Sequence, residues 1–314
     1  MLNPFRQPEL IKAATFQSMP AKFRRKRRSA WSDPNRQGAE VDSFLEGPSF
    51  DRAGNLYFVD IPFGRIFRIT PRGEWELVTE YDGWPNGLKF HKDGRAFIAD
   101  YRRGLMVLDP ATGKVECRLE TAYSEGFKGL NDLHFAGNGD LYFTDQGESD
   151  LRDLSGRLYC LRAGGRLDCL LDNVPSPNGL VLTLDESILY LAVTRGNAIW
   201  RVPLGAIGGL GVGRLGIGRV GIWVQMSGGI GPDGMAMDVE GRVAVAHPGM
   251  GAVWIFSRTG EPVSRIRACE GMRVTNVAYG GPDRKTLFMT EADSGAVLAA
   301  DLDVPGHPMY SHLD

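Results

Sequence analysis

The chain has 314 residues, of which 43% are hydrophobic and 24% are charged, a composition typical of a soluble globular protein. Its 36 Lys and Arg residues nearly balance its 38 Asp and Glu residues, so no overall field favours nucleic acid or an anionic membrane as a partner. No apolar run approaches the roughly 18 residues that span a bilayer, and residues 1–16 lack the apolar core of a secretory signal, so we expect a cytoplasmic protein.

Residues 1–42 precede the first strand pattern and are expected to form an amino-terminal arm. The arm carries a basic run, KFRRKRR, at residues 22–28. Such a run could contact an acidic partner, but a solvated segment ahead of the domain is the favoured interpretation. The arm could also contribute to closing the fold that follows it.

Six segments between residues 45 and 291 repeat one pattern: a polar start, an apolar strand, a turn and a second apolar strand. A third strand follows in each repeat, as in RIFRI at 65–69, and a fourth, more exposed strand follows in five of them, as in EWELVTE at 74–80. The six segments are LEGPSFDRAGNLYFVD, WPNGLKFHKDGRAFIAD, LNDLHFAGNGDLYFTD, PNGLVLTLDESILYLAV, PDGMAMDVEGRVAVAH and TNVAYGGPDRKTLFMTE.

The repeats recur at intervals of 40 to 55 residues, and a period near this with four short strands per unit is typical of a β-propeller. The sequence therefore predicts an all-β protein in which residues 43–314 form a six-bladed β-propeller with four antiparallel strands per blade. A β-sandwich is disfavoured because it has no recurring four-strand unit. We expect the ring to close through the tail near 308–312, the amino-terminal segment or both.

The first strand of each propeller blade lines the central channel, so equivalent residues of the six blades should converge at one level. Each residue at the start of a repeat carries a side-chain oxygen, and the set is Glu46, Asn86, Asn131, Asn178, Asp233 and Asn276. One interpretation is that these side chains cap turns, as Asn and Asp often do. Glutamate is a poor turn cap, however, and oxygen ligands are those that hard cations prefer. We therefore expect one divalent metal ion here, Ca²⁺ first, with Zn²⁺, Mn²⁺ or Mg²⁺ as alternatives.

The loops after the second strands should surround the channel mouth on the same face as this ring. Their first residues are candidates for the pocket by topology alone, and they are Asp60, Asp100, Asp145, Arg195, His247 and Glu291. Among them we expect Asp145, Arg195 and His247 to contact substrate, together with Asn86 and Asn131 of the ring. His247 could also act as a proton shuttle.

Several stretches of the chain resemble the senescence-marker-protein, gluconolactonase and luciferin-regenerating-enzyme family, the regucalcin-like six-bladed propellers. The matching stretches lie between residues 43 and 301 and include LEGPSFD, PNGLKF, LNDLHF, SPNGLVL, GPDGMAMD and TNVAYGG. The resemblance implies that Glu46, Asn178 and Asp233 hold the metal. It also implies that Asn131 contacts metal-bound water or substrate. In one departure, Gly129 stands where animal sugar-lactone enzymes carry arginine, which disfavours a sugar lactone unless Lys128 or Arg195 substitutes.

The resemblance further implies hydrolysis of a small-molecule lactone or ester to a hydroxy acid. In this hypothesis the metal acts as a Lewis acid and Asp233 as the general base. The GxSxG motif of serine hydrolases is absent from the sequence. The alternative is a propeller that binds a metal and a ligand without catalysis, because a fold alone does not determine function.

Overall fold

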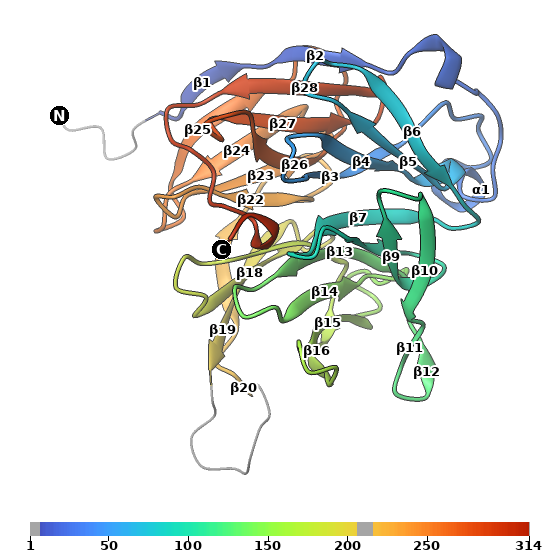
Figure 1. Ribbon diagram of the computed structural model, residues 1–314. Helices are drawn as coiled ribbons and strands as arrows, with labels where there is room; N and C mark the ends of the chain where they lie inside the picture. The colour runs from blue at the N-terminus through green and yellow to red at the C-terminus, as the bar shows by residue number, and fades with distance from the viewer. Residues whose placement is uncertain (1–6, 206–215, 314) are drawn as a thin grey trace.

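The computed structural model describes residues 7–205 and 216–313, and six β-sheets lie around a common channel in this part of the chain (Figure 1). The prediction of an all-β, six-bladed propeller is thereby confirmed. No helix within the described residues is long and apolar enough to cross a membrane.

The strands of the first three blades are, from the channel outward, β3 (Leu45–Phe50), β4 (Leu56–Asp60), β5 (Arg65–Ile69) and β6 (Trp75–Glu80); β7 (Pro85–Phe90), β8 (Ala96–Asp100), β9 (Gly104–Asp109) and β10 (Lys114–Leu119); and β13 (Leu130–Phe135), β14 (Leu141–Asp145), β15 (Gly156–Leu161) and β16 (Leu167–Val174). Between the second and third blades lies a small hairpin of β11 (Thr121–Ala122) and β12 (Glu125–Gly126).

The strands of the last three blades are, in the same order, β17 (Pro177–Leu182), β18 (Ile188–Val193), β19 (Ala198–Gly205) and β21 (Gly221–Gln225); β22 (Met235–Met237), β23 (Val243–His247), β24 (Ala252–Phe256) and β25 (Pro262–Arg267); and β26 (Val274–Gly280), β27 (Thr286–Glu291) and β28 (Ala296–Asp301). A short strand, β20 (Gly216–Ile217), also pairs with β19. The helical turns of the described residues are η1 (Ala21–Phe23), α1 (Ser32–Asn35), η2 (Ile61–Phe63) and η3 (Tyr310–His312).

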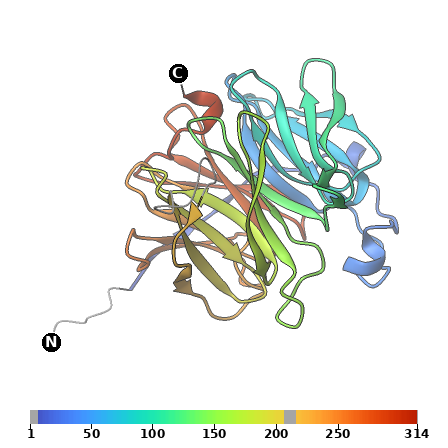
Figure 2. The ribbon, with the colours of Figure 1, turned by 90° about the horizontal axis from the view of Figure 1, so that it is seen from below.

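The amino-terminal segment closes the ring. Strand β2 (Ala14–Ser18) pairs antiparallel with β28, so it is the fourth and outermost strand of the sixth blade (Figure 1). Strand β1 (Glu9–Lys12) adds a parallel fifth strand to the fifth blade by pairing with β25. The carboxyl-terminal tail lies on the other side of the ring from the helical turns of the arm (Figure 2), and the amide of His307 donates to the carbonyl of Met237.

Apolar side chains hold neighbouring blades together. The fifth and sixth blades share a cluster that includes Val253, Ile255 and Leu298, and the second and third share one that includes Phe97 and Phe143. Burying each such side chain stabilises the fold by about 1.5–3 kcal/mol. The first strands contact one another in the cyclic order β3, β7, β13, β17, β22, β26 and β3 again, which places one residue of each blade beside the channel.

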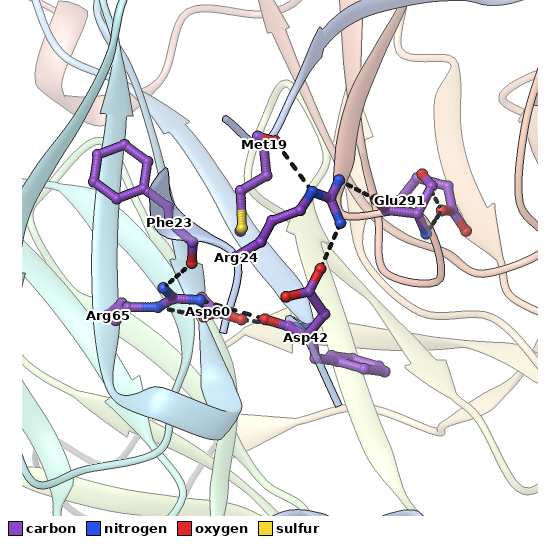
Figure 3. Close-up of polar contacts among 9 residues, drawn as sticks. Met19, Phe23, Arg24, Asp42, Asp60, Arg65 and Glu291 are labelled. Carbon is purple, nitrogen blue, oxygen red and sulfur yellow. Dashed lines mark hydrogen bonds and ion pairs between the residues drawn. The ribbon is translucent and has the colours of Figure 1, made fainter. Parts of the chain in front are cut away.

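The basic run of the arm is bound to the first and last blades. Arg24 donates to Asp42 at 2.6 Å and to the carbonyl of Ser294 at 2.8 Å, while Arg65 of β5 donates to the carbonyl of Phe23 at 2.6 Å (Figure 3). Six of the seven residues of the run are nevertheless exposed, so the run is held against the propeller at these points while most of its side chains stay in solvent. Ser294 and Arg65 lie in blades distant along the sequence, so the basic run alone gave no sign of these contacts.

Candidate active site

Irregular strand pairing turns the predicted ring residues toward the channel. The register between the first and second strands shifts at or beside the ring residue in five of the blades, namely at Glu46, Asn86, Asn131, Asn178 and Asn276. Such a bulge leaves a residue outside the ladder and re-aims its side chain. In the fifth blade Asp233 lies just before β22, and its amide donates to the carbonyl of Ala246.

Glycine follows the ring residue in four blades because neighbouring first strands approach closely there. A Cβ atom at Gly179 would lie 2.3 Å from the carbonyl oxygen of Asp233, and one at Gly47 would lie 2.4 Å from the carbonyl oxygen of Asn86. Neither distance leaves room for a side chain. The close approach brings ring side chains from different blades to the same level of the channel.

Glu46, Asn178 and Asp233, the predicted metal ligands, all line the floor of one cavity. Glu46 is 3% exposed, and burial raises its pKa to about 8 even though the Gly47 amide donates to its Oε2 atom at 2.8 Å. Burial also raises the pKa of Asp233 well above its ordinary value, and the charges of Glu46 and Asp132 add to this rise. A hydrogen bond between Asn178 and the Asp233 carboxylate opposes it.

Asp132 is a buried carboxylate that sequence reasoning missed. It is 3% exposed, and the Asn276 amide Nδ2 donates to Asp132 Oδ2 at 3.2 Å and to Glu46 Oε2 at 3.0 Å. Burial raises the pKa of Asp132, while the charge of Lys89 lowers it. A signal was present, because four other blades carry glycine at this position of the repeat.

The donor atoms at the cavity floor fit a divalent cation. The buried carboxylates of Glu46 and Asp132 share the Asn276 amide, and Asp233 lies close enough for their charges to raise its pKa, an arrangement that is costly unless positive charge compensates it. No three His, Cys, Asp or Glu residues of the described chain form a complete metal site by themselves. The set is instead mixed, with the carboxylates of Glu46 and Asp233 beside the amide of Asn178. Oxygen donors of this kind suit a hard ion such as Ca²⁺.

The remaining ring residues divide between the cavity and the structure that supports it. Asn86 and Asn131 line the cavity, as predicted for substrate contacts. The Asn131 amide donates to Gln146 Oε1 at 3.0 Å, and Gln146 in turn donates to Ser176 Oγ at 2.8 Å, which fixes the orientation of Asn131. Asn276 does not line the cavity and instead bridges the two buried carboxylates described above.

Of the residues predicted at the ends of the second strands, only Arg195 lines this cavity. Asp145 is fully buried, and its carboxylate accepts the amides of Gly129 at 2.7 Å and Lys128 at 3.1 Å. His247 is 1% exposed, and its Nε2 atom contacts the carbonyl of Gly228 at 3.0 Å. The structure therefore does not place Asp145 or His247 where they were expected to contact substrate.

Acids at these strand ends hold the loops that lead into the ring. The Asp60 carboxylate accepts the Phe44 amide at 2.7 Å, and the Glu291 carboxylate accepts the Arg273 amide at 2.9 Å. Asp100 similarly accepts the amides of Arg102 and Arg103. These acids lie at the ends of the second strands, but their carboxylates accept hydrogen bonds from backbone amides and do not line the cavity.

The walls of the cavity come partly from the arm, which sequence reasoning treated as remote. The cavity has a volume of about 300 Å³, and its lining includes Trp31 and Arg36 of the arm, Tyr101 after β8 and Arg273 before β26. The apolar residues of the arm that pack against the propeller, Phe16, Met19, Phe23 and Trp31, were signals that the arm contacts the domain. Nothing in the repeat pattern indicated which blade the arm would cover.

We expect the metal-free protein to lose stability as the pH rises from about 4.5 to about 8. The folded pKa of Glu46 is about 8, above its ordinary value of 4.5, so in this interval the folded protein keeps a proton that the unfolded chain releases. Melting temperature of chelator-treated protein, measured across this pH range, tests the expectation. Glu46→Gln removes the titration, so its melting temperature should vary less and exceed that of the parent at pH 8 by on the order of 5 °C. Parallel pH profiles of the two proteins would contradict the assignment.

The chain is similar in sequence to known proteins. Residues 44–293 match the model of the SMP-30/Gluconolactonase/LRE-like region. Lactonase drp35 of Staphylococcus aureus strain MRSA252 is 28% identical over 244 residues, which cover 75% of this chain and 72% of the relative. The corresponding protein of Staphylococcus epidermidis is 29% identical over 233 residues, covering 71% and 69%.

Solved structures share the fold. A calcium-binding protein, regucalcin, from Agrobacterium tumefaciens superposes with a TM-score of 0.76 at 22% identity, covering 97% of this chain and 99% of its own. A gluconolactonase from Xanthomonas campestris gives a TM-score of 0.73 at 20% identity, covering 93% and 99%. Because the family model spans most of the propeller and its ring, the chain belongs to the SMP-30/gluconolactonase/LRE-like family.

Proposed function

We propose that the protein is a metal-dependent lactonase that opens a cyclic ester to a hydroxy acid. The observation that carries the proposal is the meeting of Glu46, Asn178 and Asp233 at the floor of an open cavity of about 300 Å³. The names of the lactonase and gluconolactonase relatives support the same reaction class.

The three floor residues would hold one divalent ion, with Ca²⁺ favoured by an all-oxygen donor set and by the calcium-binding regucalcin relative. When bound, such an ion supplies Lewis acidity toward the ester carbonyl. Its positive charge would also compensate the buried carboxylates that otherwise destabilise this region.

Asp233 is the proposed general base. Its carboxylate would take a proton from the water that attacks the lactone carbonyl, and the ring C–O bond then breaks to leave an alcohol and a carboxylate. Burial makes Asp233 a stronger base than an exposed aspartate, because it raises the pKa of the carboxyl group. Asn131, which lines the cavity and is held by Gln146, would donate a hydrogen bond to the substrate.

A lactone panel with defined metal content tests the proposal. We expect chelator-treated protein to be inactive and Ca²⁺, Zn²⁺, Mn²⁺ or Mg²⁺ to restore ring opening, measured as acid release with a pH indicator. Boiled protein with each metal measures the background rate. If no metal-loaded form opens any lactone while calorimetry shows that the same compounds bind, the protein is a non-catalytic binding propeller.

A further inference from the structure

The cavity wall carries an arginine that the arm brings over the active site. The guanidinium of Arg36 lies 5.0 Å from the ring centroid of Phe44 and 5.6 Å from that of Trp31. The two rings themselves pack with centroids 4.9 Å apart. Stacking of this kind holds the planar group while leaving its N–H edge available to a ligand. The hydrogen bond from Arg36 to the carbonyl of Asn35 is long, at 3.4 Å.

Contacts ahead of Arg36 fix the arm to the propeller, and hydrogen bonds within the arm hold the turn that leads to Arg36. Before it, Arg24 binds Asp42 and the loop of Ser294, and Arg65 binds the carbonyl of Phe23 (Figure 3). Within the arm, Ser29 and Ser32 exchange hydrogen bonds of 2.9 and 3.1 Å between their side chains and amides. Arg36 is therefore a built part of the cavity rather than a side chain on a free tail.

Positive charge at the cavity wall exceeds its local compensation. Arg36, Arg195 and Arg273 all line the cavity. Arg273 pairs with Asp293 at 3.0 Å, whereas Arg195 has no hydrogen bond or ion pair within residues 7–205 and 216–313. Burial lowers the pKa of Arg36 and the charge of Arg273 lowers it further, while the charge of Asp293 opposes this change. The carboxylates on the cavity floor, Glu46 and Asp233, are those assigned to the metal ion.

Part of the cavity wall is aromatic, and it includes Tyr101 and Trp84. Gly129 has a φ of +154°, and a Cβ atom there would lie 2.5 Å from the ring of Tyr101. The Tyr101 ring thus fills the space that a side chain at position 129 would need. Tyr101 also packs beside Trp84, with centroids 6.0 Å apart, and both line the cavity. This wall suits a flat apolar body better than a polyhydroxylated ring.

We infer that the substrate is a lactone with an aromatic or similarly flat apolar body and a carboxylate substituent, which Arg36 and Arg195 bind at the rim. The inference rests on the proposed function, since the lactone ring must reach Asp233 while the carboxylate meets the arginines. A guanidinium presents parallel N–H donors that match both carboxylate oxygens. The apolar body then lies against Tyr101 and Trp84.

Two matched lactones test the inference: a five-membered lactone with a 4-carboxyphenyl group, and its neutral 4-carboxamidophenyl counterpart. The carboxylate compound should be opened with a kcat/KM about 10- to 100-fold higher, the range of a charge-assisted hydrogen bond. Arg36→Gln and Arg195→Gln should each reduce this preference for the carboxylate over the carboxamide by about 10-fold. Arg195 is exposed and unpaired among the described residues, so its variant should fold normally. Arg118→Gln, in an exposed part of β10, is the matched control and should change neither rate.

Binding of unreactive analogues separates this inference from the lactonase proposal. The cyclopentanone counterparts of the two compounds keep the shape but have no ester, and calorimetry measures their affinities. Tighter binding of the carboxylate ketone, lost in Arg36→Gln, supports the inference even if no lactone is opened. Equal affinities and equal opening rates for the carboxylate and the carboxamide overturn it while the lactonase proposal stands. Faster opening of gluconolactone than of either aryl lactone would overturn the assignment of the aromatic wall.

Discussion

Replacing Asp233 by asparagine should lower the kcat for lactone opening by roughly 10²- to 10⁴-fold, the usual contribution of a general base. Asparagine has nearly the same shape and keeps an oxygen for the hydrogen bond with Asn178, but it cannot take a proton from water. Rates are to be measured at saturating metal, because the variant also loses one negative charge from the cation site. The pH dependence of the parent enzyme should report the same group.

The melting temperature of the Asp233→Asn variant shows whether any loss of activity comes from misfolding. Since burial raises the pKa of Asp233, removing the charge should leave the melting temperature of the metal-free protein unchanged or higher. Asp283→Asn, in an exposed turn where the carboxylate accepts the Lys285 amide at 3.0 Å, should keep full activity. If Asp233→Asn retains its kcat within a few-fold at saturating metal, Asp233 is not the base.

Replacing Arg65 by methionine should reduce the free energy of unfolding by about 3–5 kcal/mol, the cost of leaving a buried charge without its partner. Arg65 and Asp60 have side chains that are 1% and 0% exposed and lie 2.6 Å apart. Burial already raises the pKa of Asp60 to about 6 in the presence of Arg65. Without Arg65 this pKa should rise further, so the loss of stability is largest at neutral pH and shrinks as Asp60 becomes protonated in acid.

Urea unfolding at pH 7 and pH 5 measures this effect. Arg152→Met is the matched control, because Arg152 is 89% exposed and solvent screens its pair with Asp150, so the variant should unfold like the parent. In the double variant Asp60→Leu, Arg65→Met, removing both charges should recover part of the loss. A cost below about 1 kcal/mol for Arg65→Met would show that water reaches Asp60 and that the arm is not sealed against β5.

The propeller and the level of its ring could be predicted because both follow from repetition along the chain. The first three strands of every blade follow the same order along the chain, so one pattern predicted six sheets, and the residue at each repeat start was expected to face the channel. Glu46, Asn178 and Asp233 line one cavity for this reason, although they lie far apart in the sequence.

Residues outside the repeat could not be placed in the same way. Arg36 reaches the cavity through tertiary contacts of the arm, and the partners in those contacts come from the first and sixth blades. Asp145 belongs to the repeat and lies at the end of its second strand, as expected. Its carboxylate nevertheless accepts the amides of Lys128 and Gly129 and does not line the cavity. The hydrogen-bond partner of such a side chain depends on atoms that become its neighbours only after folding.

The pairing of β2 with β28 has a consequence for how the molecule is made. Ala14 precedes all six repeats and its partner Ala299 follows them, so the seam forms only after every blade has been synthesised. Until β2 pairs with it, β28 presents an unpaired edge that other nascent chains could join. Completion of the ring is therefore a late step of folding, and removal of β2 should impair assembly more than a nick in a surface turn.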